Sequence, residues 1–177
     1  MCSNRKRKVL AMAAALTTAV GLSTSAAADS AYEMIAYLES LSGSRLAAGD
    51  YAGAIDFATK RLHGGTAMSR LVEHTNLCVA YTVVRDFALA RERCDTALEL
   101  ARHVDEDLSH GVSRTEQETA KAMTNRGVLK AMTGDVAGAA SDFRRALAVT
   151  GPRNAAGSNL LRVESAMTDR LAMTEAR

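Results

Sequence analysis

Two cysteines are the residues in this sequence best placed to react with each other. Cys78 and Cys94 each lie eight residues from Asp86, where the sequence predicts a turn between two antiparallel helices. Both thiols then lie at the same height of the hairpin, so an oxidising compartment would allow a disulfide between them. Two buried free thiols are the alternative. The sequence contains no Cys-x-x-Cys motif, which argues against oxidoreductase activity.

Four histidines offer a second candidate for chemistry: His63, His74, His103 and His110. His103 and His110 flank a polar, acidic stretch. Together with Asp105 and Asp107 they could ligate a metal, although the spacing is not that of a zinc motif. A solvated loop is the favoured interpretation, and an enzyme or metal site in this stretch is the lesser alternative. No nucleophile elbow, phosphate loop or paired-carboxylate motif occurs, so we expect no catalysis and no cofactor.

The segment 1–28 has the pattern of a cleavable signal peptide. Four basic residues at 5–8 precede a largely apolar run from Val9 to Leu22, and Ala26 to Ala28 offers an Ala-x-Ala cleavage site. The apolar run of 14 residues is shorter than the roughly 20 that a membrane-spanning helix needs. Cys2 precedes the apolar run and so cannot be a lipoprotein cysteine. These features predict a periplasmic or secreted protein with no stable membrane insertion after cleavage.

Cleavage after Ala28 would change the net charge. The full chain has a formal net charge of +2, whereas the remainder has 18 Lys and Arg against 20 Asp and Glu, a net charge of −2. Only 4% of the residues are aromatic, and none alternates with arginines in a basic stripe. Nucleic acid is therefore not an expected partner.

The hydrophobic period is helical almost throughout the chain after residue 28. An apolar stripe that begins at Ile35 and Leu38 predicts a first helix ending before Gly49. Further helices are expected at about 51–62, 66–84, 87–102, 113–133 and 136–150, with a last amphipathic helix after Pro152. Ser113 and Glu116 have the spacing of a capping box at the start of the fifth helix.

One pattern occurs three times in these helices. A small residue precedes an alanine by twelve positions in each copy, in the pairs Ser42 and Ala54, Cys78 and Ala90, and Gly127 and Ala139. An aspartate that can cap a helix lies four residues before each alanine, at Asp50, Asp86 and Asp135. The interval from Asp86 to Asp135 is about 13 positions longer than the interval from Asp50 to Asp86. The first interval is close to the regular period of a helix-pair repeat, and the second exceeds it. The extra residues fall in the acidic stretch between the last two copies.

The repeated pattern resembles the tetratricopeptide repeat (TPR), a helix–turn–helix unit of about 34 residues. The middle copy matches best, through Asn76, Leu77, Cys78, Tyr81, Phe87, Ala90, Ala97 and Leu98. The last copy matches through Asn125, Gly127, Gly134, Ala139, Phe143, Ala146 and Pro152. The resemblance implies an all-α fold in which three antiparallel helix pairs, within residues 29–152, stack as a right-handed superhelix. Residues 153–177 would form a C-terminal capping helix or tail. An ordinary helical bundle is the alternative.

In TPR proteins the first helix of each unit lines a concave groove that binds peptides. The resemblance implies groove positions at Val72, Thr75, Val79, Thr82 and Val83 in the middle unit, and at Lys121, Thr124, Val128, Ala131 and Met132 in the last. These positions do not supply the lysine-and-asparagine clamp of the chaperone-binding members. A mostly apolar groove favours a hydrophobic strand or helix. The chain's own C-terminal helix or a second copy could cover this face instead.

These observations predict an exported TPR-like adaptor or scaffold that mediates protein–protein contacts without catalysis. A self-associating helical module, and so a homo-oligomer, is the main alternative.

Overall fold

The computed structural model describes residues 32–104 and 113–175. The predicted signal peptide and most of the acidic stretch, including Asp105, Asp107 and His110, lie outside these ranges. The described residues form seven α-helices and no strand, which confirms the all-α class. The helices are α1 (Leu41–Ala47), α2 (Tyr51–Arg61), α3 (Ala67–Val83), α4 (Phe87–Ala101), α5 (Arg114–Met132), α6 (Val136–Thr150) and α7 (Ala155–Glu175).

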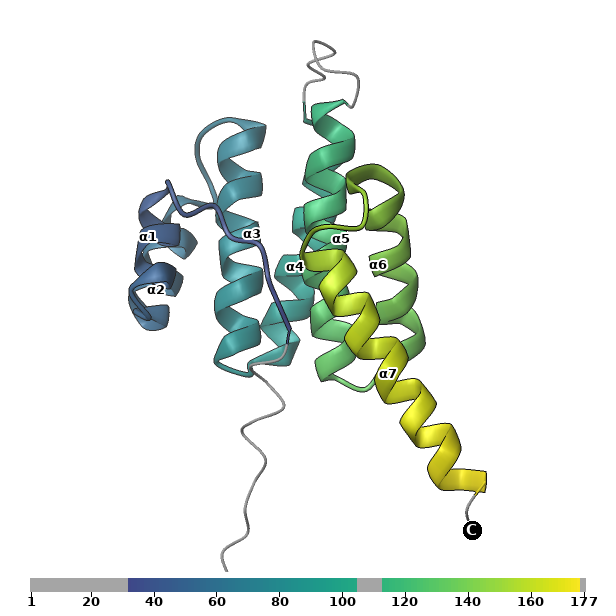
Figure 1. The fold of residues 1–177 in the computed structure, drawn as a ribbon. Coiled ribbons are helices and arrows are strands. Elements are labelled where there is room, and N and C mark those ends of the chain that lie inside the picture. Colours follow the sequence, from purple (N-terminus) through teal and green to yellow (C-terminus); the bar gives the residue numbers. More distant parts are fainter. Residues whose placement is uncertain (1–31, 105–112, 176–177) are drawn as a thin grey trace, which may run out of the picture.

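The helices pack in order along the chain. α3 pairs with α4 and α5 pairs with α6, and α4 joins the two pairs by packing on α5. The short pair α1 and α2 packs on α3 at one end, and α7 packs on α6 at the other (Figure 1). The first half of α7 is anchored by Ala156, Asn159 and Val163, each at most 1% exposed, whereas its second half extends away from the body.

Helix starts follow the predicted caps. The side chains of Asp50, Asp86 and Asp135 accept a hydrogen bond from the main-chain N–H three residues ahead, at 2.9, 3.2 and 2.9 Å respectively. The capping box between Ser113 and Glu116 forms with both hydrogen bonds at 3.1 Å. These bonds satisfy N–H groups that a helix leaves without an internal partner, so local sequence is sufficient to set these boundaries.

The N-terminal helix is shorter than the sequence predicts. The apolar stripe predicted a helix from about Ile35, but α1 begins only at Leu41, where Ser40 is the N-cap. Residues 32–37 are not helical and run as an extended segment across α3. The prediction was wrong because the main-chain groups of this segment bind side chains of other helices, as described below, and these bonds replace those of a helix.

Small residues bring α5 and α6 together. A Cβ atom placed on Gly127 would lie 2.6 Å from Cε1 of Phe143, a side chain that is fully buried. Contacts of this length are shorter than van der Waals separation, so the absence of a side chain at Gly127 is what admits the ring. The twelve-residue spacing of the repeat thus marks the crossing of a helix pair.

Replacing Gly127 by alanine should therefore destabilise the protein. We expect Gly127→Ala to lower the free energy of unfolding by about 1–2 kcal/mol, because the added methyl group pushes against an immobile ring. Urea denaturation followed by circular dichroism measures this change. Gly138→Ala is a poor control because its Cβ would meet the capping side chain of Asp135. Ala137→Gly, at an exposed position of α6, is a better one, and its cost should be limited to helix propensity.

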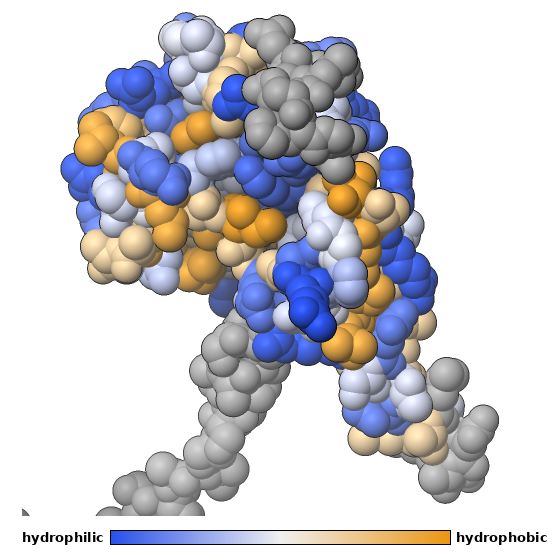
Figure 2. Space-filling view, turned by 45° about the horizontal axis from the view of Figure 1, so that its top comes forward, coloured by the Kyte–Doolittle hydropathy of each residue, from blue (hydrophilic) through white to orange (hydrophobic). Residues whose placement is uncertain are grey.

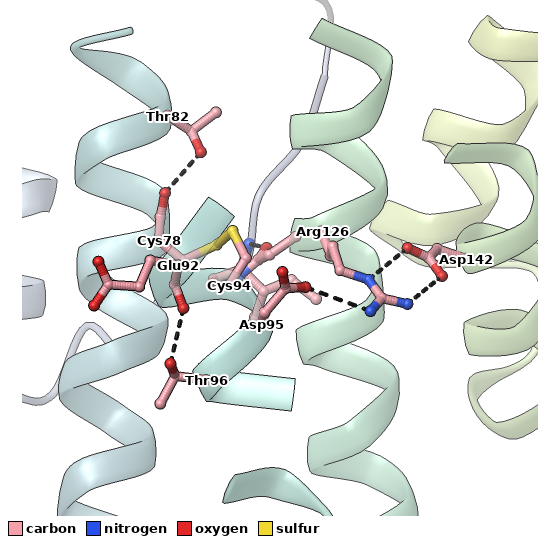
Figure 3. The surroundings of a disulfide bond; sticks show 10 residues. Cys78, Thr82, Glu92, Cys94, Asp95, Thr96, Arg126 and Asp142 are labelled. Atoms are coloured by element: carbon pink, nitrogen blue, oxygen red, sulfur yellow. Dashed lines mark hydrogen bonds and ion pairs between the residues drawn. A yellow bond between two sulfur atoms is a disulfide. The ribbon is translucent and has the colours of Figure 1, made fainter. Parts of the chain in front are cut away.

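Cys78 and Cys94 are bonded to each other in the structure, with an S–S distance of 2.04 Å and a Cα–Cα distance of 4.8 Å (Figure 3). Both residues are 1% exposed. The bond joins α3 to α4 at the close crossing of the hairpin, beside Ala90 and Leu129.

A buried ion pair joins the next two helices (Figure 3). Arg126 of α5 donates two hydrogen bonds of 2.8 Å to Asp142 of α6, and the Nζ of Lys130 lies 2.9 Å from the same carboxylate. Burial alone would raise the pKa of Asp142, but the bonds from Arg126 and Lys130 outweigh it and hold the pKa below its usual value. Arg126 also contacts Asp95 of α4, at 3.5 Å. The three helices are therefore fixed to one another by charge as well as by apolar packing.

Within residues 32–104 and 113–175, no helix combines the length and the apolar character needed to cross a membrane.

Candidate functional site: an asparagine-lined groove

Three asparagines bind the main chain of the extended segment. Asn76 of α3, Asn125 of α5 and Asn159 of α7 are each at most 1% exposed. The Asn125 side chain accepts a hydrogen bond from the N–H of Ile35 and donates one to its C=O, both at 2.7 Å. Asn159 binds both groups of Glu33 at 2.8 and 2.7 Å, and Asn76 binds those of Tyr37 at 2.9 and 3.5 Å. We call these asparagines the ladder, and residues 32–37 the strap.

The pairing of every second residue defines the conformation of the strap. In an extended chain the N–H and C=O of one residue point to the same edge, and those of the next residue point to the opposite edge. A side-chain amide matches this arrangement because it offers one acceptor and two donor hydrogens in one plane. The ladder therefore binds an extended polypeptide as a neighbouring strand would, and does so through groups that every amino acid except proline carries.

The ladder follows the sequence repeat. Asn76 and Asn125 each lie two residues before the small residue of their copy, Cys78 and Gly127. Asn159 follows Asn125 at the spacing of one TPR unit. α7 thus carries its asparagine where a further copy of the pattern would have it, and the strap crosses α3, α5 and α7 in turn.

One side of the strap is apolar. Tyr32 and Met34 pack against the core formed by α3 to α7, and Ala36 packs against a smaller cluster of α1, α2 and α3 residues. Met34 contacts all three buried clusters of the described residues, so it is the principal anchor. Beside Met34 lies an open pocket of about 430 Å³, lined by Tyr32, Met34, Tyr51, Thr82, Val83, Val128 and Met132.

The other side of the strap is polar. The hydroxyl of Tyr37 donates a hydrogen bond to the Glu118 carboxylate. The Nζ of Lys121 lies 3.0 Å from the same carboxylate and 5.2 Å from the centre of the Tyr37 ring. Burial of Tyr37, with its bond to Glu118, raises the pKa of this phenol above its usual value. The hydroxyl therefore keeps its proton and acts as a donor.

The two ends of the strap are held differently. At its N-terminal end, the Glu33 side chain forms only an exposed ion pair with Arg162, at 3.4 Å. At its C-terminal end, Asn76 also donates bonds of 2.8 Å to the hydroxyls of Ser40 and Ser42, which belong to the start of α1. The strap is therefore continuous with a docked helix at one end and less constrained at the other.

Of the ten groove positions predicted in the sequence, four line the open pocket: Thr82, Val83, Val128 and Met132. The others do not line it. Thr75 and Thr124 are each 2% exposed, and Val79 packs into the cluster formed with Leu46 and Ala54. Val72 is half-buried on α3. Val72, Thr75 and Val79 lie on the same face of α3 as Thr82 and Val83, but the open pocket lies further along, towards the C-terminal ends of α3 and α5.

The sequence reasoning did not assign the asparagines to the groove, although Asn76 and Asn125 were among the residues that matched the repeat. A signal was present: a polar amide recurs at equivalent positions of otherwise apolar helices, and Asn159 follows at the spacing of one further unit. Lys121, one of the predicted groove positions, contacts the strap through the Tyr37 ring. The C-terminal helix does not lie over the groove in the described ranges; the strap does.

The proposed metal-ligating residues are only partly described. His103 forms an exposed contact of 3.2 Å with Glu99 of its own helix. Among the described residues, no group of three or more His, Cys, Asp or Glu side chains is arranged to hold a metal ion.

His74 is the one histidine of the described part of the chain that is buried, and it is 8% exposed on α3. Burial lowers its pKa from 6.5 to about 4, with a smaller contribution from the nearby charge of Arg93. Because the unfolded chain binds this proton more readily, the free energy of unfolding should fall as the pH falls from about 6.5 to about 4. His74→Gln should remove much of this dependence in thermal melts between pH 7 and 4. His103→Gln, at an exposed histidine, should leave it unchanged.

No protein-family model, curated protein or solved structure matches this chain in the comparisons made. We therefore infer the function from the geometry of the groove.

Proposed function

We propose that this protein is an exported TPR-like adaptor that binds an extended segment of a partner protein in the groove across α3, α5 and α7. The observation that carries this proposal is the ladder. Each asparagine pairs with both main-chain groups of one strap residue. Buried asparagines in a core of alanine, leucine and valine are costly unless their hydrogen bonds are made. Three of them at equivalent positions form a surface suited to a polypeptide main chain.

The pocket beside the ladder supports a protein ligand. Its walls are mostly apolar, with Val83 44% exposed at the rim and Val128 fully buried at the base. A volume of about 430 Å³ is within the usual range for ligand pockets and would accept one or two apolar side chains. Apolar and polar side chains are interspersed over the face seen in Figure 2.

Two further observations agree with the other parts of the proposal. A bond between Cys78 and Cys94 is expected to persist in an oxidising compartment, which supports export. The stacking of α3 to α7 through small residues resembles that of TPR units and supports a repeat scaffold. We assign no catalytic role to the protein, and the adaptor acts by binding alone.

Site-specific photo-crosslinking in the producing cell tests this function. A photoreactive phenylalanine at Val83 should form an adduct with a partner, and mass spectrometry should identify one segment of that partner at the crosslink. The matched control is the same group at Leu161, which is 71% exposed on α7 outside the groove. Equal adducts from both positions, or no adduct from Val83, would contradict the assignment.

A further inference from the structure

We propose that the strap is a built-in competitor for the groove, and that the partner segment repeats its chemistry: a long apolar residue, a small residue two positions later and a tyrosine next to that. This inference depends on the proposed function, because it concerns the ligand and the regulation of the same site. The corresponding strap residues are Met34, Ala36 and Tyr37.

The ladder alone cannot select a sequence. Its bonds go to N–H and C=O groups of the strap, so any extended segment without proline at those positions could make them. Selection must come from the side chains on the two sides of the segment. On one side Met34 contacts all three buried clusters, and Ala36, a small residue, packs against the cluster that contains Leu46.

On the opposite side Tyr37 is bound through its hydroxyl and through its ring. Glu118 is 5% exposed and accepts the phenol proton in a hydrogen bond, while Lys121 lies over the ring. Hydrogen bonds to a charged partner contribute more than neutral ones, and cation–π contact adds to them. Phenylalanine would fill the same space but leave the buried carboxylate with one bond fewer, so a tyrosine is the preferred residue.

The strap occupies the ladder and the contacts around Met34, Ala36 and Tyr37 that such a segment would use. A ligand from another protein therefore binds only to the fraction of molecules in which the strap has left the ladder, and its apparent affinity falls by that fraction. Release is expected to start at Glu33, whose side chain forms only an exposed ion pair although its main chain is bound by Asn159, and to proceed towards Tyr37, next to α1. The groove is therefore expected to bind only segments that match the strap closely or are present at high local concentration.

A peptide with the strap sequence, residues 30–39 with blocked ends and a fluorophore, tests the inference by fluorescence anisotropy. The full chain is compared with the double variant Met34→Ala, Tyr37→Ala, which removes both anchors of the strap and leaves the ladder intact. We expect the peptide to bind the double variant about 100-fold more tightly than the unmodified protein. Tyr37→Phe in the peptide should weaken binding about 10-fold. Glu33→Gln in the peptide should change it less than about twofold.

The outcomes separate the inference from the proposed function. Equal affinity for the full chain and the double variant would show that the strap does not compete; the inference would then fail and the groove would remain a peptide site. No binding to a double variant whose circular dichroism is native would overturn both.

Amide hydrogen exchange on the unmodified protein provides a check that needs no variant. Saturating peptide should accelerate exchange at the N–H of Glu33 and Ile35, because the peptide replaces the strap on Asn159 and Asn125. Unchanged exchange at these amides in the presence of bound peptide would place the ligand elsewhere and contradict the proposal.

Discussion

Asn125→Ala should release the middle of the strap and destabilise the protein by about 2–3 kcal/mol. The substitution leaves the N–H and C=O of Ile35 without their partners, at a position where Asn125 itself is 1% exposed. An unsatisfied buried polar group costs about 1–3 kcal/mol, and the space left by the amide adds to this. Urea denaturation measures the loss of stability. Amide exchange at Ile35 should accelerate by at least about 10-fold, which shows that the strap has loosened.

Asn154→Ala is the matched control for this experiment. Asn154 makes only local bonds, to Thr150, Gly151 and Gly157 around the start of α7. Its loss should cost about 1 kcal/mol, as for a helix cap, and leave exchange at Ile35 unchanged. If Asn125→Ala behaves like Asn154→Ala in both measurements, the bonds to the strap do not contribute as proposed.

Removing the disulfide should have an effect of similar size. The double variant Cys78→Ala, Cys94→Ala is expected to lower the free energy of unfolding by about 3 kcal/mol. The bond closes a sequence separation of 16 residues, and a loop of this size restricts the unfolded chain by about that amount. The sulfur atoms lie in a buried cluster with Ala90 and Leu129, so the packing that the two alanines lose adds to this cost.

A reducing agent distinguishes the bond from the packing of the two side chains. The unmodified protein should lose stability on reduction, whereas the double alanine variant should be insensitive. Peptide mapping of denatured, unreduced protein should recover Cys78 and Cys94 in one linked fragment. Recovery of both residues as free thiols would show that they are buried side chains without a bond.

Much of the architecture can be predicted from local sequence. The bounds of α2 to α6 agree with the sequence expectations to within one or two residues, because aspartate and serine caps, together with apolar periodicity, act over one or two turns. The interval between repeats correctly located the long connection after α4. The proximity of Cys78 and Cys94 also follows from position alone, since a hairpin centred near Asp86 brings them to the same height, although position alone left open whether they are bonded.

The groove could not be predicted in the same way. Ile35 and Leu38 fit an apolar helical stripe, yet residues 32–37 are extended because Asn76, Asn125 and Asn159 lie up to 126 residues away in sequence and still bind this segment. Thr75 and Val79 do not line the open pocket for a related reason: Val79 packs in the cluster that Ala36 of the strap contacts, so the pocket is open only further along α3.

The sequence by itself determined that this protein is a series of paired helices, where α2 to α6 begin, and which small residues allow the pairs to approach. These properties depend on interactions between residues close in the chain or repeated at a regular interval. Only the tertiary structure decided that three asparagines form one surface, and that the protein's own strap occupies it. The physical reason is that a side-chain amide has no preferred partner until the stack of helices brings a main chain within hydrogen-bond distance.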